Sequence, residues 1–177
     1  MKKLLLGIAA VCLAGFTFAQ DAPLWMRHSV ISPDGTTIAF TYKGDIYTVP
    51  VAGGRAMQIT TNPAYDTAPV WSPDSKRIAF ASDRMGSLDV YIVAKDGGEP
   101  RRLTTHSGSE TPLAFKDAGH VLFSAGIMPS AEAVVFPSNG QFNQVYRVSV
   151  EGGRPTMISS MPMECISINK EGAMLYQ

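Results

Sequence analysis

The residues best suited to nucleophilic chemistry lie in one polar stretch, residues 106–110, which reads HSGSE. Acyl transfer needs an activated serine beside a base and an oxyanion hole. Neighbouring residues of a loop rarely aim Ser107 or Ser109 at His106, and the sequence has no G-x-S-x-G elbow. We therefore interpret the stretch as a polar loop between structural units, and we expect no catalytic residue in this chain.

Metal or ligand binding has two further candidates. His28 and His120 lie far apart, and Cys165 is the only cysteine beyond the N-terminal segment, so no spacing indicates zinc and we expect neither a metal nor a cofactor. Asp83 and Arg84 could bind a substrate carboxylate, since arginine matches carboxylates bidentately. We favour a structural interpretation, in which Asp83 caps its loop and Arg84 ties one repeat to the next.

Aromatic residues could offer a platform for a peptide. Trp25 and Trp71 are interpreted instead as packing residues, because large rings fill the wedge between adjacent sheets. Tyr47, Tyr91 and Tyr146 recur at one position of a repeat, which packing explains more simply than ligand binding.

An internal repeat positions all of these residues. Residues 30–60 read VISPDGTTIAFTYKGDIYTVPVAGGRAMQIT, and residues 70–104 read VWSPDSKRIAFASDRMGSLDVYIVAKDGGEPRRLT. The SPD and IAF motifs recur at a spacing of 40 residues, which indicates an array of supersecondary units. The motif positions are Ser32, Pro33, Asp34, Gly35 and Phe40 in the first unit, and Ser72, Pro73, Asp74 and Phe80 in the second.

Each unit predicts four antiparallel strands. In the second unit we expect strands at 69–72, 77–82, 89–94 and 101–104, with a Pro-Asp turn after the first strand and a Gly-Gly turn before the fourth. The third strand, with consecutive β-branched and aromatic residues, suits burial on both faces. Charges on the fourth strand indicate an outer edge. The Gly-Gly turns are Gly53-Gly54, Gly97-Gly98 and Gly152-Gly153.

A third unit and part of a fourth complete the sequence. The third places Phe123 at the position of Phe80, but it has FKDAGHVLF in place of the SPD turn and a longer loop at 126–143. Four strands per unit without helical periodicity indicate an all-β fold, a β-propeller of four-stranded antiparallel blades. We expect blades at 23–61, 66–105 and 110–160, and a partial blade at 163–177.

About three and a half blades cannot close a propeller ring, which takes roughly four to eight. We therefore expect the sequence to be an incomplete propeller and a segment of a longer protein. Open sheet edges would make such a segment less stable, or more prone to association, than the closed ring.

The N-terminal residues predict export. Two lysines precede an apolar run, residues 4–16, and a Thr-Phe-Ala pattern follows it. This is the organisation of a secretory signal peptide over residues 1–19, cleaved between Ala19 and Gln20. The run is shorter than the ~20 apolar residues that cross a bilayer, so we expect no transmembrane segment in the mature chain, 20–177. The periplasm is the expected compartment, with the extracellular space as the alternative.

Composition excludes some function classes. The formal net charge is zero and the apolar fraction is 45%, which fits an ordinary globular protein and not a basic nucleic-acid-binding face. Cleavage of the signal peptide would leave Cys165 alone, so no internal disulfide can form. Stability must then come from packing.

The repeat motifs resemble those of two propeller families. SPDG…IAF…DIY…GG…IT and SPDS…IAFASDR…DVYIV…GGEPRRLT are similar to repeats of tricorn protease homologues and of the Tol-Pal translocation propeller. The stretch FPSNGQFNQVYRVSVEGGRP, residues 136–155, and the opening PLWMRHSVISPDGTTIAF resemble bacterial tricorn-like peptidases. The resemblance covers residues 23–176.

This resemblance implies a role in handling peptides. Tricorn-like propellers precede a PDZ-like module and a serine peptidase domain, and they filter or dock peptides for it. The catalytic residues of that family belong to the later domain, and no position of this chain corresponds to them. The expected partners are peptides or proteins, together with those downstream domains. The alternative function is that of a Tol-Pal-type interaction propeller, which binds proteins of the cell envelope.

The mature chain, residues 20–177, is predicted to have no peptidase activity of its own, because it lacks a set of nucleophile, base and oxyanion hole. Purified protein should leave fluorogenic peptides uncleaved. Turnover that survives repurification and is lost on a single Ser→Ala substitution would contradict this prediction.

Overall fold

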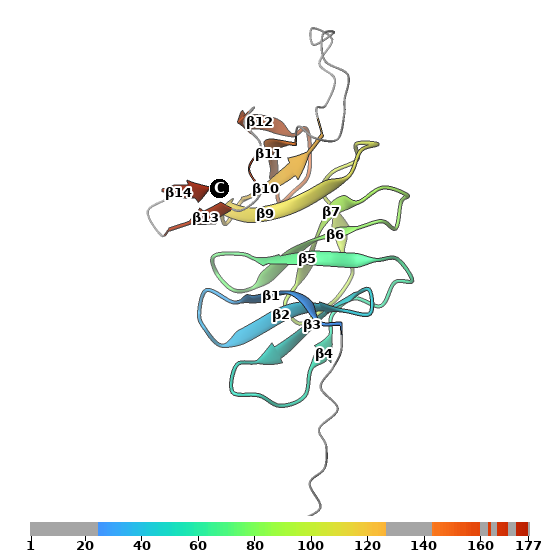
Figure 1. The fold of residues 1–177 in the computed structure, drawn as a ribbon, viewed down its shortest axis with the longest axis vertical. Coiled ribbons are helices and arrows are strands. Elements are labelled where there is room, and N and C mark those ends of the chain that lie inside the picture. Colours follow the sequence, from blue (N-terminus) through green and yellow to red (C-terminus); the bar gives the residue numbers. More distant parts are fainter. Residues whose placement is uncertain (1–24, 127–142, 160–162, 164–165, 170–172, 177) are drawn as a thin grey trace, which may run out of the picture.

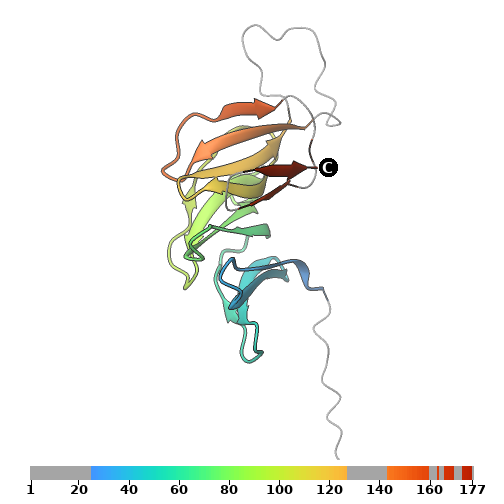
Figure 2. The same cartoon turned by 90° about the vertical axis from the view of Figure 1, so that its left-hand side faces the viewer.

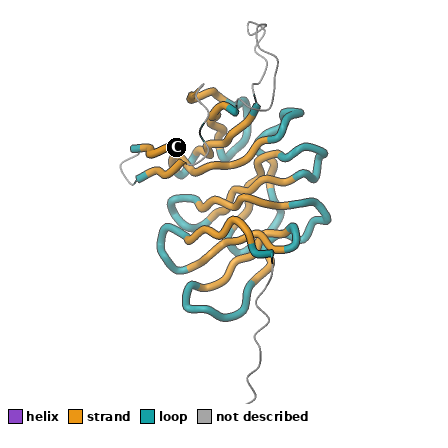
Figure 3. The backbone as a smooth tube through the Cα atoms, viewed as in Figure 1, coloured by secondary structure: helices purple, strands orange, loops and turns teal. Residues whose placement is uncertain are grey.

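The computed structural model describes residues 25–126, 143–159, 163, 166–169 and 173–176. The expected signal peptide, most of the long loop of the third unit and Cys165 lie outside the described residues. Every regular element of the described part is a strand (Figure 3). It contains no helix long and apolar enough to cross a membrane.

Three four-stranded antiparallel sheets follow one another along the chain (Figure 1). The prediction of an all-β propeller with four-stranded blades is therefore confirmed. The first sheet consists of β1 (Arg27–Ile31), β2 (Thr37–Tyr42), β3 (Asp45–Pro50) and β4 (Met57–Gln58). The second consists of β5 (Asp66–Trp71), β6 (Arg77–Ser82), β7 (Asp89–Ala94) and β8 (Arg101–Arg102). The third consists of β9 (Glu110–Asp117), β10 (His120–Ala125), β11 (Gln144–Ser149) and β12 (Thr156–Ser159).

A further pair, β13 (Ile166–Ile168) with β14 (Met174–Tyr176), follows the third sheet. The first strands of successive units lie side by side, because β5 contacts both β1 and β9, and β9 contacts β13. Figures 1 and 2 show the sheets stacked in chain order, and the described sheets do not close into a ring.

Side chains interlock between consecutive sheets. Ile78, Phe80 and Tyr91 of the second sheet pack in one cluster with Ala39 and Ile46 of the first. Their sequence neighbours point to the opposite face, since successive side chains of a strand alternate. A second cluster therefore joins the second sheet to the third, through Ala79, Val90, Ile92, Phe115, Val121 and Phe123. This burial on both faces explains why β6 and β7 have the bounds that the sequence predicts.

The recurring aromatic positions form one stack in each sheet. Phe80 lies over Tyr91 with ring centroids 5.9 Å apart, and Phe123 lies over Tyr146 at 5.7 Å. The first sheet has the same pair, Phe40 and Tyr47, at 5.8 Å. All three phenylalanines are buried.

The Ser-Pro-Asp segments form the same turn in the first two sheets. Ser72 Oγ donates to Asp74 Oδ1 at 2.5 Å and accepts from the Arg77 N–H at 2.9 Å. Ser32 Oγ makes the matching bonds to Asp34 and to the Thr37 N–H. The serine bond lowers the pKa of each aspartate. Ser75 takes the left-handed conformation (φ 57°) that Gly35 has in the first turn (φ 73°).

Two other kinds of turn are built differently. In the third sheet Asp117 replaces the motif, and its Oδ1 accepts from the Gly119 N–H at 2.7 Å. The six glycines of the Gly-Gly turns all have φ between 85° and 125°, a region that side chains with a Cβ rarely adopt. These are Gly53, Gly54, Gly97, Gly98, Gly152 and Gly153.

Strand bounds differ from the prediction at the start and the end of the second unit. β5 begins at Asp66, three residues before the predicted start, because a bulge with Ala68 at φ 50° lets pairing with β6 continue past Thr67. β8 ends at Arg102 instead of 104. Thr104 leaves the ladder because its side chain, rather than its backbone, accepts the Val90 N–H at 2.9 Å.

Replacing Phe80 by alanine should destabilise the fold by about 3–5 kcal/mol, because a fully buried ring between two sheets would leave a cavity. The matched surface change, Met57→Ala on the exposed outer strand β4, should cost about 0.5 kcal/mol or less. Urea denaturation of both variants measures the two costs. Equal midpoints would show that the cluster between the first two sheets does not determine stability.

Candidate functional site

The first strands of the units, β1, β5, β9 and β13, border an apolar groove of 830 Å³. Val30 and Ile31 of β1 and Val70 and Trp71 of β5 line one part, and residues 113–118 and 166–169 line the rest. Every strand that borders it is the first of its unit, so the groove lies at the axis of the stacked sheets. Its lining is largely apolar, although Lys116 and Asp117 also border it.

Two residues give this groove its character. Ile31 is 58% exposed, which is unusual for a large aliphatic side chain at the end of an inner strand. Trp71 is buried instead, and its Nε1–H donates to the Val30 carbonyl across the first two sheets at 3.2 Å. Trp71 is thus a packing residue, as expected, and Ile31 is an exposed apolar side chain in the lining of the groove.

Trp25 does not pack between sheets, and that expectation is wrong. It is 70% exposed, and the Arg27 guanidinium lies 5.6 Å from its ring centroid. Trp25 precedes β1, so the ring lies beyond the wedge between the first two sheets that would have buried it.

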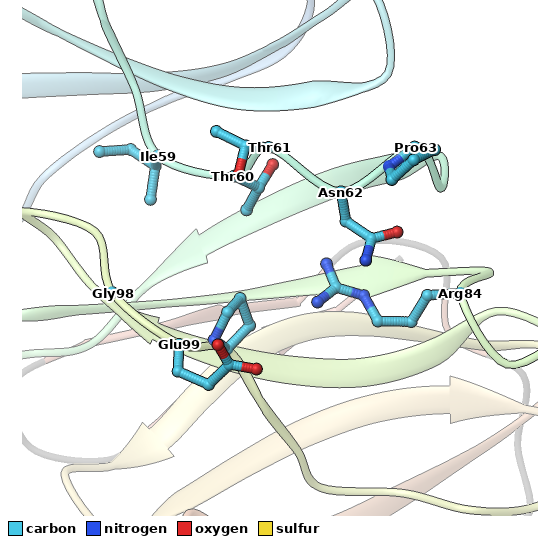
Figure 4. A pocket seen from close by; sticks show the side chains of 9 residues that line it. Ile59, Thr60, Thr61, Asn62, Pro63, Arg84, Gly98 and Glu99 are labelled. Carbon is cyan, nitrogen blue, oxygen red and sulfur yellow. The ribbon is translucent and has the colours of Figure 1, made fainter.

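A smaller polar groove of 260 Å³ lies between the first and second sheets. Figure 4 shows the guanidinium of Arg84 directed into the space between Asn62 and Glu99. Thr60 and Thr61 line the side that belongs to the connection after the first sheet. The groove thus combines one cationic, one anionic and several neutral polar side chains.

The contacts of Arg84 are satisfied within its own sheet. Its Nη2 lies 3.0 Å from both carboxylate oxygens of Asp66, which is fully buried, and its Nε donates to Ser82 Oγ at 2.8 Å. The guanidinium also lies 4.5 Å from the ring centroid of Tyr91. The expectation that Arg84 ties one repeat to the next is therefore wrong. The early start of β5 places Asp66 where it pairs with this arginine.

Asp83 does cap backbone, although the backbone belongs to the incoming connection. Its Oδ1 accepts from the Tyr65 N–H at 2.7 Å. The pair Asp83 and Arg84 thus holds the start of β5: Asp83 accepts the Tyr65 N–H, and Arg84 binds the carboxylate of Asp66.

We call the place where one sheet connects to the next a joint. The first joint lies between the first and second sheets and the second joint between the second and third, and both share one polar arrangement. In the first joint Thr60 Oγ1 accepts from the Ile46 N–H at 3.0 Å and donates to Asp45 Oδ1 at 3.2 Å. The Asp66 N–H then donates to the Gly44 carbonyl at 2.7 Å, from the second sheet to the first.

The second joint repeats these bonds with other partners. The Glu110 N–H donates to the Leu88 carbonyl at 2.7 Å, and Thr104 Oγ1 donates to Glu110 Oε2 at 2.6 Å. Burial raises the pKa of the Glu110 carboxyl to about 7, against the lowering effect of the Thr104 bond. Burial also raises the pKa of Asp45 in the first joint.

Glu110 is the buried polar residue that sequence reasoning missed. The sequence predicts a polar loop between units for HSGSE, yet Glu110 begins β9 and is fully buried. His106 and Gly108 do form a loop, in which the Gly108 N–H donates to His106 Nδ1 at 3.0 Å. The signal was available, because an acid stands six residues after a threonine in both units, at Asp66 and Glu110.

Comparison with known proteins identifies the family. Residues 23–177 match the family described as the tricorn protease N-terminal beta propeller domain. The chain belongs to this family. The resemblance inferred from the repeat motifs is thus confirmed over the whole length that carried it, residues 23–176.

Individual relatives point in the same direction. The chain is 35% identical over 88 residues to tricorn protease homolog 1 of Streptomyces coelicolor, covering 50% of this chain and 8% of that protein. It is 44% identical over 55 residues to the Tol-Pal system protein TolB of Bordetella pertussis, covering 30% and 13%. The structure of TolB from Acinetobacter baumannii matches with a TM-score of 0.65 at 19% identity, over 85% of this chain and 37% of that one. This chain therefore spans a minor part of each relative.

Removing the charge of Arg84 should be costly, because Asp66 would remain buried without its cation. Arg84→Gln should lower the free energy of unfolding by about 3–5 kcal/mol. Arg101→Gln removes an exposed pair with Glu151 and should cost about 1 kcal/mol or less. Chemical denaturation measures the free energy of unfolding of both variants and of the unmodified protein.

The double variant Asp66→Asn/Arg84→Gln is the control for a buried unpaired charge. It should recover much of the stability lost in Arg84→Gln, because an amide has no charge to leave unpaired. A double variant that is less stable than the single variant would show that the arginine acts through packing on Tyr91 alone.

Proposed function

We propose that this chain is a non-catalytic propeller segment that docks peptide substrates for a peptidase domain that follows it in the parent protein. The apolar groove of 830 Å³ carries the proposal. It is apolar, it is bordered by the first strand of every unit, and it includes the exposed side chain of Ile31. Fully burying such a side chain contributes about 1.5–3 kcal/mol, enough to favour a bound peptide.

Family membership supports the peptidase context. The matching family is named for a protease, and a protease homolog of Streptomyces coelicolor shares 35% of residues over half of this chain. Its peptidase chemistry would belong to other parts of such a protein, since this chain covers 8% of that relative. The role proposed here for the described sheets is binding and selection.

A Tol-Pal-type interaction propeller is the second candidate. The observation that favours it is the 44% identity to TolB over 55 residues, which is higher than the 35% identity to the tricorn protease homolog. In that case the same groove would bind a segment of an envelope protein and no peptidase would follow.

Export is part of the proposal. The charged start, the apolar run and the Ala19-Gln20 junction support delivery to the periplasm. A periplasmic location would suit both candidates, because each needs access to proteins or peptides outside the cytoplasm.

The Ile31→Asp substitution tests the groove. Binding of fluorescein-labelled random decapeptides, measured by fluorescence anisotropy, should weaken about tenfold or more, since apolar contact is replaced by a charge. Met57→Asp places the same charge on the exposed outer strand β4 and should leave binding unchanged. Equal loss in both variants, or no binding to the unmodified protein, would contradict peptide docking in this groove.

The parent protein separates the two candidates. In a full-length peptidase, Ile31→Asp should raise KM for peptides and leave kcat unchanged, because docking acts before the chemical step. An unmodified parent that binds folded envelope proteins and ignores peptides would favour the interaction propeller instead.

A further inference from the structure

Two carboxyl groups meet inside the second joint with too few partners. Asp89 begins β7 and Glu110 begins β9, and both are fully buried. Within the described part of the chain, both oxygens of Asp89 and Oε1 of Glu110 have no hydrogen-bond partner. The two residues are neighbours, because the Glu110 N–H donates to the carbonyl of Leu88, next to Asp89, and the Asp89 carboxyl adds to the rise in the pKa of Glu110. Buried carboxylates without donors are costly, so a compensating group is needed.

The basic side chains around this pair do not supply the missing hydrogen bonds. Arg102 of β8 places Nη2 2.8 Å from Asp89 Oδ2, but the contact is poorly directed, and Arg102 Nε is also buried without a partner. His106, from the connection, has Nδ1 3.6 Å from Glu110 Oε1. That nitrogen accepts the Gly108 N–H, so it carries no proton to donate. Thr104 donates to the other oxygen of Glu110.

The first joint solves the same problem with an arginine. Asp66 stands where Glu110 stands in the next unit, and Arg84 binds both of its oxygens. Aligning the Phe80 and Phe123 strands places Ile127 at the sequence position of Arg84. The second joint therefore has an acid of the same kind without the matching charge in its sequence.

We propose that a proton takes the place of that arginine: Asp89 and Glu110 share one proton across the joint between the second and third sheets, and its loss loosens the joint. Glu110 then donates its O–H to an oxygen of Asp89, and Arg102 balances the single remaining charge. Asp66, the acid that begins the second sheet, is paired with Arg84 and needs no such proton.

The pH dependence follows from the direction of the shift. Burial raises the pKa of Glu110 to about 7, above its ordinary 4.5. A group that binds its proton more tightly when folded contributes stability that is present at low pH and is lost as pH rises towards the folded value. Between about pH 4.5 and 7, each pH unit should therefore reduce the folding equilibrium constant about tenfold from this group.

The unmodified protein provides the primary test. A 13C NMR titration of the glutamate side-chain carboxyls should show Glu110 ionising near pH 7, above the ordinary glutamate value of 4.5. Ionisation of Glu110 near its ordinary value would overturn the proposal.

Hydrogen exchange tests whether the joint itself responds. The amide of Glu110 bridges to Leu88 in the second joint, and the amide of Asp66 bridges to Gly44 in the first. The protection factor of the Glu110 amide, divided by that of the Asp66 amide and with both corrected for intrinsic exchange, should fall several-fold between about pH 5 and pH 8. A ratio that stays constant would show that the proton does not control the joint.

A neutral variant removes the titrating group. Glu110→Gln supplies a permanent N–H in the position of the proton, so its stability relative to the unmodified protein should rise as pH increases from about 5 to 8. Glu99→Gln makes the same change on an exposed side chain and should show no such trend. If Glu110→Gln and Glu99→Gln give the same pH profile, the proposal fails.

Discussion

The fold depends on one constraint: a sheet whose strands are apolar on both faces must be covered on both sides. Ile78 and Phe80 on β6 point to the first sheet, and Ala79 between them points to the third. The second sheet is therefore stable only as the middle layer of a stack. This constraint sets the order of the sheets and brings their first strands together in one row.

Polar groups occupy the places where this stack would otherwise leave backbone unpaired. At each joint a threonine side chain accepts an N–H from the third strand of the preceding sheet, at Ile46 and at Val90. The acid that begins the next sheet is then drawn into the interior, because its own N–H bonds across the joint. Burial of Asp66 and Glu110 is thus a consequence of how the sheets are connected.

The sequence predicts those parts of the structure that repeat. The bounds of β6 and β7 could be predicted because alternation and β-branched runs reflect burial on both faces. The start of β5 could not, because the bulge at Ala68 depends on the neighbouring strand and not on local propensity. Glu110 was hidden by its polar neighbours, since burial of a single acid leaves no periodic pattern. The apolar groove needed the structure, because it forms only where several first strands end side by side.

The self-contained pairing of Arg84 with Asp66 has a consequence for how such arrays evolve by duplication. Because the arginine and the acid that it neutralises belong to the same sheet, a copied unit carries both charges with it and imposes no charge on its neighbours. At this polar site, a new neighbour need provide only a backbone carbonyl, like that of Gly44, in addition to the apolar side chains that cover the sheet. Units of this type can therefore be added or exchanged without matching charged side chains on either side, whereas a unit that begins with Glu110 inherits an acid whose counter-charge it must find elsewhere.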